Sequence, residues 1–339
     1  MFRKVSIIGD GAMGSFLGML LCTKRQARAA GRIERVRLWG YDRGQLEQIA
    51  RDGENKRFLP GYKLPAAIEF EASDERIMAG ADLVVSAVPC QYMRRVWERL
   101  KAYFPEGVPI VSVAKGIENK TLLRPSEILA DVLGGGTSCA ALSGPTIADE
   151  LARRLPATAC AAAADEALAK EIQYTFNTPW LRIYTNTDIV GVELAGAMKN
   201  IIAIAAGIID GVGAGDNAKA ALLTRGLAEI TRLGVAMGAR PQTFAGLAGL
   251  GDLVTTCISP KGRNRSFGER VGKGQTAEQA RQATESVVEG VATCESVVAL
   301  AKRHGVEMPI TQAVHEVLFE DKPVQEAIAD LMKRRLKAE

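Results

Sequence analysis

The stretch from Asp188 to Asp210, DIVGVELAGAMKNIIAIAAGIID, constrains the fold most because it has helical length and is almost wholly apolar. Between its two aspartates only Glu193, Lys199 and Asn200 interrupt the apolar residues. A helix that is apolar on every side is either a membrane span or the core helix of a large domain. Lys199 near the middle, the glycines along the segment and the lack of a second such stretch favour a core helix, so we predict no membrane span.

A lysine on a core helix has two interpretations. Its stem can cover apolar surface while its charged head reaches water, or its amine can take part in chemistry. The apolar neighbours of Lys199 and the adjacent amide of Asn200 favour a functional amine. The two histidines support this choice: His304 lies in a charged turn and His315 on a predicted helix, so a histidine base is disfavoured.

Length and composition place the chain among ordinary globular proteins. The 339 residues predict two domains, and a hydrophobic content of 47% allows a large core. The net charge of +4 permits anionic ligands but does not indicate a nucleic-acid-binding protein. The six cysteines form no CxxC pair and no set with histidine at ligand spacing. We therefore predict reduced thiols, no metal site, no signal peptide before the first strand, and a cytoplasmic location.

The N-terminus carries a nucleotide-binding pattern. A short apolar strand at Val5–Ile8 runs directly into GDGAMG and then into a predicted helix at Ser15–Cys22. Strand, G-x-G-x-x-G and helix in this order form the dinucleotide fingerprint, whose glycines permit a tight turn and the close approach of a pyrophosphate. The helix N-terminus adds N–H donors and a positive dipole end. Asp10 brings an acid into this turn, and we expect its side chain to point away from the pyrophosphate.

The second predicted strand, Val36–Trp39, leads to the position that distinguishes NAD from NADP. The residues there are Gly40, Tyr41, Asp42 and Arg43. Arg43 could meet a 2′-phosphate, and Asp42 could instead bond the ribose hydroxyls. We favour NADP(H) over NAD(H), although a surface turn explains Asp42 and Arg43 equally well.

The segment from Lys24 to Arg37 holds six basic residues and one acid, Glu34. Without interleaved aromatic residues, we predict a solvated helix end and loop here, not a nucleic-acid surface.

Further apolar runs predict an alternation of strands and helices. Strands are predicted at residues 83–88, 110–113, 139–142, 157–164 and 181–184, and a helix at residues 165–177. This alternation indicates a doubly wound, Rossmann-like α/β sheet. Pro89, Lys115, Gly144 and Thr146 follow predicted strands, at the edge where open α/β sheets bind ligands.

After Tyr184 the strand pattern stops and only helices with glycine-rich turns are predicted. We therefore assign residues 1–186 to a dinucleotide-binding domain and residues 187–339 to an all-helical domain. Two segments of the helical part could carry chemistry: residues 247–252, which are rich in glycine and end in Asp252, and the basic loop at residues 259–265, which suits a phosphate. Either segment, taken alone, is more often a turn than a site.

Together these motifs resemble the bacterial type of NAD(P)-dependent glycerol-3-phosphate dehydrogenase over nearly the whole chain. The motifs are GDGAMG, VPCQ, VAKGIE, LSGPTIADEL, GVELAGAMKNIIAIAAGIIDG, LLTRGLAEITRLG, GLAGLGDLVTTC, GRNRSFG and VVEG. The resemblance implies reversible hydride transfer between C2 of sn-glycerol 3-phosphate and the nicotinamide of NAD(P), which yields dihydroxyacetone phosphate. It also implies a Rossmann domain, a helical substrate-binding and dimerisation domain, a homodimer, and a role in supplying phospholipid precursors.

The resemblance also implies roles for residues at the matching positions. Lys199 becomes the general acid/base, with Lys115 and Asp252 in the same catalytic set. With the strand-end residues added, the substrate-binding set is Lys115, Asn200, Asp252, Thr256, Gly144, Thr146, Gly262, Arg263 and Asn264. The cofactor-binding set is Gly9, Gly11, Ala12, Met13, Gly14, Tyr41, Arg43, Pro89, Lys115, Ala148, Arg263, Val287 and Glu289.

Three features depart from the family pattern. Asp10 replaces a small residue, residues 24–32 look like an insertion after the first helix, and Gly262 stands where a serine is common. The last change removes one donor to the substrate phosphate.

The chemistry of the residues fits the resemblance. Carbonyl reduction needs a proton at the oxygen, and a buried lysine can deliver it if its pKa falls toward about 7–8. Lys115 would lower the pKa of Lys199 by like-charge repulsion, and Asp252 would act in the opposite direction.

Two alternatives stay open. One is another reductase of this architecture, such as a hydroxyacid dehydrogenase or ketopantoate reductase, against which the basic GRNR segment argues. The other is a non-catalytic NAD(P)-sensing module, which would not need Lys115, Lys199 and Asp252 together.

Overall fold

A computed structural model describes residues 2–26, 33–284 and 287–336 of the chain. The chain divides into two compact units. A sheet unit comprises Met1–Lys115 and Arg124–Ile189, and a helical unit comprises Gly116–Leu123 and Val190–Glu339. The short segment Gly116–Leu123 groups with the helical unit. A single domain boundary near residue 186 would assign it to the first domain.

The sheet unit is built on eight strands in the order β3-β2-β1-β4-β5-β6-β7-β8. The strands are β1 (Lys4–Ile8), β2 (Arg35–Trp39), β3 (Ile68–Phe70), β4 (Leu83–Ser86), β5 (Ile110–Ser112), β6 (Cys139–Ser143), β7 (Ala157–Ala163) and β8 (Leu181–Asn186). Strands β1 to β6 pair in parallel, so their carboxyl ends share one edge. The strand order reverses between β1 and β4, and such a switch point is where open α/β sheets bind ligands.

Strand β7 runs antiparallel to β6, so the sheet is mixed and not uniformly parallel. The link between the two strands holds only α6 (Ala148–Ala152), a helix of five residues. Such a helix advances the chain by about 7.5 Å, which is too short to return it along the sheet for a parallel strand. The Rossmann-like class predicted for this unit is confirmed, with this antiparallel strand as an addition.

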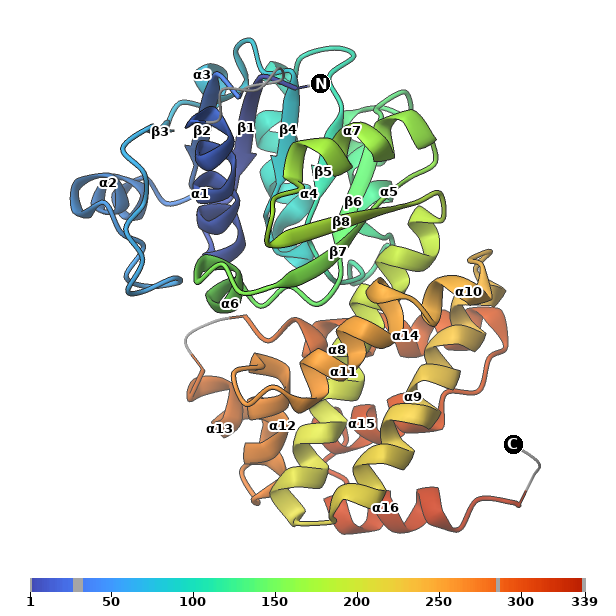
Figure 1. Ribbon diagram of the computed structural model, residues 1–339. Helices are drawn as coiled ribbons and strands as arrows, with labels where there is room; N and C mark the ends of the chain where they lie inside the picture. The colour runs from blue at the N-terminus through green and yellow to red at the C-terminus, as the bar shows by residue number, and fades with distance from the viewer. Residues whose placement is uncertain (1, 27–32, 285–286, 337–339) are drawn as a thin grey trace. The chain divides into compact units, whose positions relative to one another are not determined.

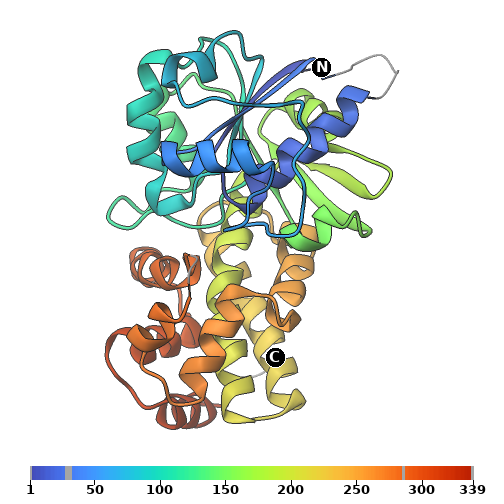
Figure 2. The ribbon, with the colours of Figure 1, turned by 90° about the vertical axis from the view of Figure 1, so that its left-hand side faces the viewer.

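Helices cover both faces of the sheet (Figures 1 and 2). On one face lie α1 (Ala12–Gln26), α6 and α7 (Glu166–Phe176), and on the other lie α3 (Asp74–Met78), α4 (Cys90–Leu100) and α5 (Pro125–Leu133). Helix α2 (Arg43–Asp52) precedes β3, and a short 3-10 turn, η1 (Lys101–Tyr103), follows α4. Because both faces are covered, strands such as β4 are buried along their whole length, which explains their continuous apolar sequence.

The basic segment at residues 24–37 is only partly a helix end and loop. Helix α1 continues to Gln26, and residues 27–32 lie outside the described part of the chain. Residues 36 and 37 belong to β2, in agreement with the strand predicted at Val36–Trp39, and the strand begins one residue earlier, at Arg35. Arg37 on this strand pairs with Glu69 on β3 at 3.2 Å.

The helical unit is organised around α8 (Ile189–Val212). The other helices are α9 (Asp216–Ala236), α10 (Pro241–Phe244), a π-helical turn η2 (Leu247–Gly251), α11 (Asp252–Ile258), α12 (Arg263–Gly272), α13 (Ala277–Gln282), α14 (Glu289–His304), α15 (Pro309–Phe319) and α16 (Val324–Met332). Figure 2 shows α8 surrounded by its neighbours, and 94% of its most apolar stretch is buried. Burial in a protein core therefore accounts for its apolar sequence.

Two glycines explain how α8 packs so closely. A Cβ atom at Gly207 would lie 1.9 Å from the backbone oxygen of Arg265, and one at Gly268 would lie 2.0 Å from that of Ile204. Any side chain at either position would force α8 and α12 apart. Close packing therefore requires glycine at both positions, although glycine has a low helix propensity.

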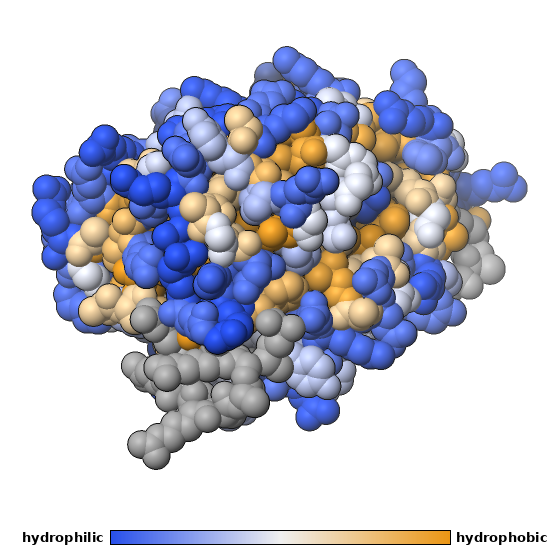
Figure 3. Space-filling model, turned by 90° about the horizontal axis from the view of Figure 1, so that it is seen from above, coloured by the Kyte–Doolittle hydropathy of each residue, from blue (hydrophilic) through white to orange (hydrophobic). Residues whose placement is uncertain are grey.

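The surface seen from above in Figure 3 is mixed, with apolar atoms showing between hydrophilic side chains. This mixture is ordinary for a globular protein and requires no special partner.

Candidate active site

The glycine turn after β1 has three distinct glycine positions. Gly9 has a φ of +116°, and a Cβ atom there would lie 2.6 Å from the backbone oxygen of Ala87. A Cβ atom at Gly14 would lie 1.9 Å from the oxygen of Gly9, whereas one at Gly11 would meet no atom of the described residues within 4 Å. Packing thus demands the first and third glycines, and the second leaves open space before the N-terminus of α1. The turn therefore fits the pyrophosphate of a dinucleotide.

Ala12 and Met13 form the first turn of α1 and are partly exposed, beside the glycine turn. Pro89 follows β4 and precedes the first residue of α4, and Ala148 begins α6 after β6. Each of these predicted cofactor residues therefore lies at a strand end or a helix start of the sheet unit.

The residues after β2 have structural partners of their own. Asp42 caps α2 by accepting the N–H of Gln45 at 3.1 Å. Arg43 is the first residue of α2 and pairs with Glu47 at 2.8 Å, with 80% of its side chain exposed. An exposed ion pair of this kind contributes little to stability. The guanidinium of Arg43 is therefore available to a ligand.

Tyr41 presents an exposed aromatic ring beside β2. It meets Trp39 edge-on at 6.3 Å, and the guanidinium groups of Arg95 and Arg99 lie over its face at 5.3 and 5.5 Å. Arg99 is also held by a bidentate pair with Asp74. The neighbourhood is thus aromatic and positively charged.

Lys115, Gly144 and Thr146 lie together where β5 and β6 end. The amine of Lys115 donates to the oxygen of Gly144 at 2.9 Å and to Oγ1 of Thr146 at 3.4 Å. Gly144 has a φ of +139°, a conformation that glycine adopts without strain. The structure therefore assembles these three predicted substrate residues in the sheet unit.

Lys199 lies in the helical unit and its side chain is almost wholly buried. Its amine bonds Oδ1 of Asp252 and donates to Oγ1 of Thr256 at 2.5 Å. Thr256 in turn donates to Asp252 at 3.2 Å. Lys199 is 5% and Asp252 1% exposed, so the interpretation of a lysine that reaches solvent is wrong. The carboxylate favours the ammonium form of this amine and holds it in one place.

Asn200, the residue after Lys199, belongs to a chain of amide hydrogen bonds. Asn264 donates to Oδ1 of Asn200 at 3.0 Å, and its own Oδ1 accepts the N–H of Gly290 at 3.0 Å. Asn200 on α8 is thereby tied to the start of α12 and the start of α14. All three residues are buried.

The predicted basic loop is shorter than expected, because helix α12 begins at Arg263 and Gly262 is its N-cap. Arg263 is exposed and has no hydrogen-bond or ion-pair partner among the described residues. Arg265 is not a solvated residue of this loop: it pairs with Asp210 on α8 at 2.6 Å. A Cβ atom at Gly262 would lie 3.0 Å from the oxygen of Thr256, which leaves little room for a serine.

Two further predicted cofactor residues lie at the start of α14. Val287 is 39% exposed, and Glu289 is the first residue of the helix and partly buried. Like Arg263, both belong to the helical unit.

Asp10 and its neighbours were not assigned a role by the sequence. The Asp10 carboxyl lies against Gly40, where a Cβ atom would come within 2.8 Å of it. The buried side chain of Asn55 donates to the oxygen of Asp10 at 2.7 Å and to Ser15 at 2.8 Å. Asn55 sits in an irregular, charged loop, so no sequence pattern predicts that it supports the glycine turn.

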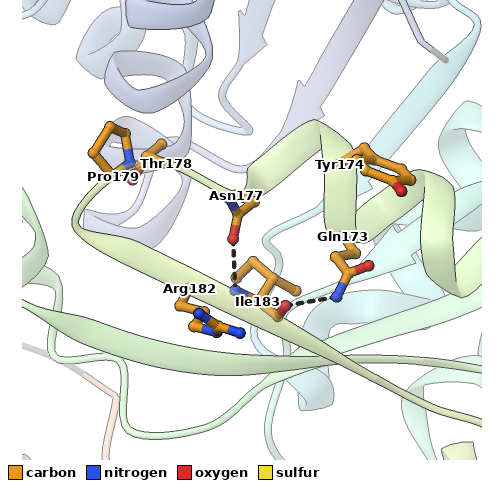
Figure 4. Close-up of a pocket in the computed structure, with 7 residues that line it drawn as sticks. All are labelled: Gln173, Tyr174, Asn177, Thr178, Pro179, Arg182 and Ile183. Carbon is orange, nitrogen blue, oxygen red and sulfur yellow. Dashed lines mark hydrogen bonds between the residues drawn. The ribbon is translucent and has the colours of Figure 1, made fainter.

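A separate hollow of about 390 Å³ lies between α7 and β8 in the sheet unit (Figure 4). Its lining residues are Gln173, Tyr174, Asn177, Thr178, Pro179, Arg182 and Ile183. Gln173 and Asn177 bond the backbone of Ile183 at 2.8 and 3.1 Å, so these amides join α7 to β8. None of the predicted site residues lines this hollow.

The sheet unit thus carries a dinucleotide turn with a lysine at a neighbouring strand end, and the helical unit carries a buried amine beside a carboxylate and a hydroxyl. These features match the class of nicotinamide-dinucleotide-dependent dehydrogenases, enzymes that hold the cofactor on a nucleotide fold and move the proton with a positioned acid/base.

Comparison with known proteins identifies the family. The sequence model of the NAD-dependent glycerol-3-phosphate dehydrogenase N-terminus matches residues 4–169, and that of its C-terminus matches residues 188–329. A glycerol-3-phosphate dehydrogenase (NAD(P)+) of Chlorobium limicola is 46% identical over 99% of both chains. One from Geobacter sp. strain M21 is 46% identical over 100% of this chain and 99% of its own. The chain therefore belongs to the NAD-dependent glycerol-3-phosphate dehydrogenase family, and the predicted resemblance is confirmed.

Solved structures agree with this assignment. Glycerol-3-phosphate dehydrogenase from Coxiella burnetii has a TM-score of 0.92 and 36% identity, and the match covers 98% of this chain and 99% of that one. A ketopantoate reductase from Ralstonia eutropha has a TM-score of 0.59 at 16% identity, over 97% of this chain and 100% of that one. The second likeness reflects a shared fold alone. The protein is an NAD(P)-dependent oxidoreductase.

Proposed function

We propose that this enzyme catalyses reversible hydride transfer between NAD(P)H and dihydroxyacetone phosphate, with sn-glycerol 3-phosphate as the reduced product. The observation that carries the proposal is the buried group of Lys199, Asp252 and Thr256. A proton donor held in a fixed position is what carbonyl reduction requires. The names of two relatives, which include glycerol-3-phosphate dehydrogenase, support this choice of substrate.

In this mechanism the bound nicotinamide supplies or accepts the hydride. The Lys199 ammonium gives its proton to the C2 oxygen during reduction, and the amine takes it back during oxidation. Asp252 favours the protonated form of the amine and orients it through their ion pair, and Thr256 holds the same amine from a second direction. The carboxylate also balances the charge of the ammonium, because burying an ion pair costs less free energy than burying an isolated ammonium.

The remaining predicted residues hold the substrate. The Arg263 guanidinium suits two phosphate oxygens, since its fork of N–H donors matches their spacing. Asn264 and Asn200 offer amide groups held by their mutual hydrogen bond. Lys115 is oriented by Gly144 and Thr146 and adds positive charge for an anionic substrate or cofactor.

For the cofactor, we propose that the glycine turn holds the pyrophosphate of NAD(P) and that NADP(H) is preferred over NAD(H). Arg43 supports the preference because its only carboxylate partner among the described residues is the exposed Glu47. A dianionic 2′-phosphate competes well for such a guanidinium.

We also propose the wider assignments that family membership suggests. Residues 1–186 bind the dinucleotide, residues 187–339 bind substrate and dimerise, and the enzyme acts in the cytoplasm to supply phospholipid precursors. Light scattering on the purified protein tests the dimer: the expected mass is twice the 36.3 kDa of one chain.

The deciding assay mixes the purified protein with dihydroxyacetone phosphate and either NADPH or NADH, and follows the nicotinamide absorbance. We expect turnover with the phosphorylated ketone and little with ketopantoate or unphosphorylated dihydroxyacetone. Turnover of ketopantoate in place of dihydroxyacetone phosphate would support the rival reductase. Cofactor binding without turnover of any ketone would support a sensing module.

A further inference from the structure

Three buried polar atoms in the sheet unit have no hydrogen-bond partner within the described part of the chain: Oγ of Ser143 on β6, Oδ2 of Asp10 and Nε2 of Gln45. Buried polar groups in native proteins are nearly always paired, because an unpaired group costs the free energy of its lost hydration. The Asp10 atom is an acceptor and the Gln45 atom is a donor, and both residues lie near the end of β2. A ligand group that both donates and accepts would therefore suit the pair.

Asp10 and Gln45 have neighbours in common near the carboxyl end of β2. The Asp10 carboxyl lies against Gly40, directly after this strand. Gln45 lies in the first turn of α2, which Asp42 caps, and its Oε1 accepts Arg57 at 3.0 Å. Asp42 and Arg57 are also the two charged groups that act on Asp10. In a dinucleotide fold, this strand end receives the ribose of the adenosine.

The Asp10 backbone is held firmly in this position. The side chain of Asn55 donates to the backbone oxygen of Asp10 at 2.7 Å and to Oγ of Ser15 at 2.8 Å. Its own Oδ1 accepts the N–H of Phe58 at 3.1 Å. The carboxyl also occupies the space that a side chain at position 40 would fill. The expectation that Asp10 points away from the pyrophosphate leaves open where it points, and the structure places its carboxyl against Gly40, after β2.

We propose that Asp10, with Gln45, reads the 2′ position of the cofactor's adenosine ribose. This inference rests on the proposed use of NAD(P). Asp10 thereby takes the role that dinucleotide folds usually give to an acid at the tip of β2. A free 2′-hydroxyl can donate to the Asp10 carboxylate and accept from the Gln45 amide, which satisfies both atoms. A 2′-phosphate brings only negative oxygens and is repelled by the ionised carboxylate.

The charge of Asp10 makes the discrimination between a 2′-hydroxyl and a 2′-phosphate depend on pH. Burial raises the pKa of Asp10 to about 6; its backbone hydrogen bond and Arg57 act against this, and the charge of Asp42 adds to it. Above this pKa the carboxylate disfavours a 2′-phosphate. Below it the neutral carboxyl can donate to a phosphate oxygen instead. Arg43 attracts a 2′-phosphate at any pH in this range, so the preference for NADP(H) is expected to be strongest in acid.

Two fragments of the cofactor test the proposal without any turnover. 5′-AMP carries the free 2′-hydroxyl of NAD, and 2′,5′-ADP carries the 2′-phosphate of NADP. Calorimetry gives the Kd of each for the parent protein and for Asp10→Asn, at about pH 5 and about pH 8, on either side of the Asp10 pKa. The 5′-phosphate is common to both fragments and cancels in their ratio.

At about pH 8, Asp10→Asn should strengthen 2′,5′-ADP relative to 5′-AMP by about tenfold, because a like charge is removed. At about pH 5 the parent and Asp10→Asn should show the same ratio of Kd values for the two fragments. The 2′-phosphate itself titrates near pH 6, but this change is the same for both proteins, so only the difference between them counts. An unchanged ratio at both pH values would overturn the proposal.

Asp42→Asn is the matched control, since asparagine keeps the helix cap and removes the neighbouring charge. It should retain most of the pH-dependent difference between the fragments. If Asp42→Asn abolishes the difference and Asp10→Asn does not, Asp42 is the reader and the proposal fails. Because the fragments report on nucleotide binding alone, failure here is distinguishable from a lack of activity on dihydroxyacetone phosphate.

Discussion

Asn264 and Asn200 are joined by a side-chain hydrogen bond of 3.0 Å, from Nδ2 of the former to Oδ1 of the latter. The same Asn264 accepts the N–H of Gly290 at 3.0 Å. The residue beside Lys199 is therefore fixed by the first turns of two other helices. Asn264 has a positioning role in addition to its predicted contact with substrate.

Replacement of Asn264 should separate these roles. Asn264→Ala leaves the buried N–H of Gly290 unpaired, so we expect a loss of about 1–3 kcal/mol in the free energy of unfolding. Asn264→Asp keeps an acceptor for Gly290 but sets an oxygen against Oδ1 of Asn200, so it should also lose activity. Urea unfolding and kcat/KM measure the two effects. Full activity in Asn264→Asp would show that the bond to Asn200 does not matter for catalysis.

Lys199→Met removes the transferable proton and keeps the apolar stem. We expect kcat to fall by at least about a hundredfold, the usual contribution of a positioned acid/base. Equilibrium binding of the cofactor should barely change.

Lys199→Met also leaves Asp252 buried without its ion-pair partner, which can cost about 3–5 kcal/mol of stability. The double variant Lys199→Met, Asp252→Asn removes both charges and should recover part of that stability but none of the activity. Near-normal turnover by either folded variant would exclude this lysine from the mechanism.

Arg263→Ala tests recognition of the substrate phosphate. We expect a large fall in kcat/KM for dihydroxyacetone phosphate and a far smaller one for unphosphorylated dihydroxyacetone, since binding energy at the phosphate can be expressed in the hydride step. Lys261→Ala, an exposed change in the preceding loop, is the control for general loss of positive charge. Equal proportional losses on the two ketones would show that Arg263 does not read the phosphate.

Arg43→Ala tests the proposed preference for NADP(H). The change removes an exposed guanidinium whose partner Glu47 contributes little to stability. NADPH should bind more weakly and NADH almost unchanged, as measured by nicotinamide fluorescence. An equal effect on the two cofactors, or none, contradicts the role of Arg43.

Glu229 caps a helix from a distance. The carboxylate, which is 1% exposed on α9, accepts the N–H groups of Ile310 and Thr311 at the start of α15, at 2.7 and 3.2 Å. Glu229→Ala should cost about 2–4 kcal/mol because it leaves these donors buried and unpaired. Glu278→Ala, at a side chain that is 58% exposed, should change stability by less than about 0.5 kcal/mol.

Burial raises the pKa of Glu229 above its ordinary value of 4.5. The folded protein then holds this proton to a higher pH than the unfolded chain does. The resulting stabilisation is complete below pH 4.5 and is lost as the pH rises through the folded pKa. Relative to Glu229→Gln, the parent should therefore lose stability over this rise, and parallel stability curves would contradict the assignment.

The sequence by itself determined the features that depend on neighbours in the chain. The strand, glycine turn and helix at residues 4–26 follow from local backbone rules, because the turn can close only where glycines allow it. The apolar run of α8 predicted a core helix, and Lys199 stood out against it. Family motifs then supplied a candidate site with no knowledge of the fold.

Only the tertiary structure decided features made by residues far apart in the chain. The Asp10 carboxyl faces Gly40, Asn264 bonds Asn200, and Arg265 leaves the expected loop to pair with Asp210. Contacts of this kind leave no periodic trace in the sequence. The direction of β7 and the start of α12 at Arg263 likewise depend on connection length and packing. Local propensity cannot report these, because several conformations of a short polar segment have similar energies until the rest of the fold selects one.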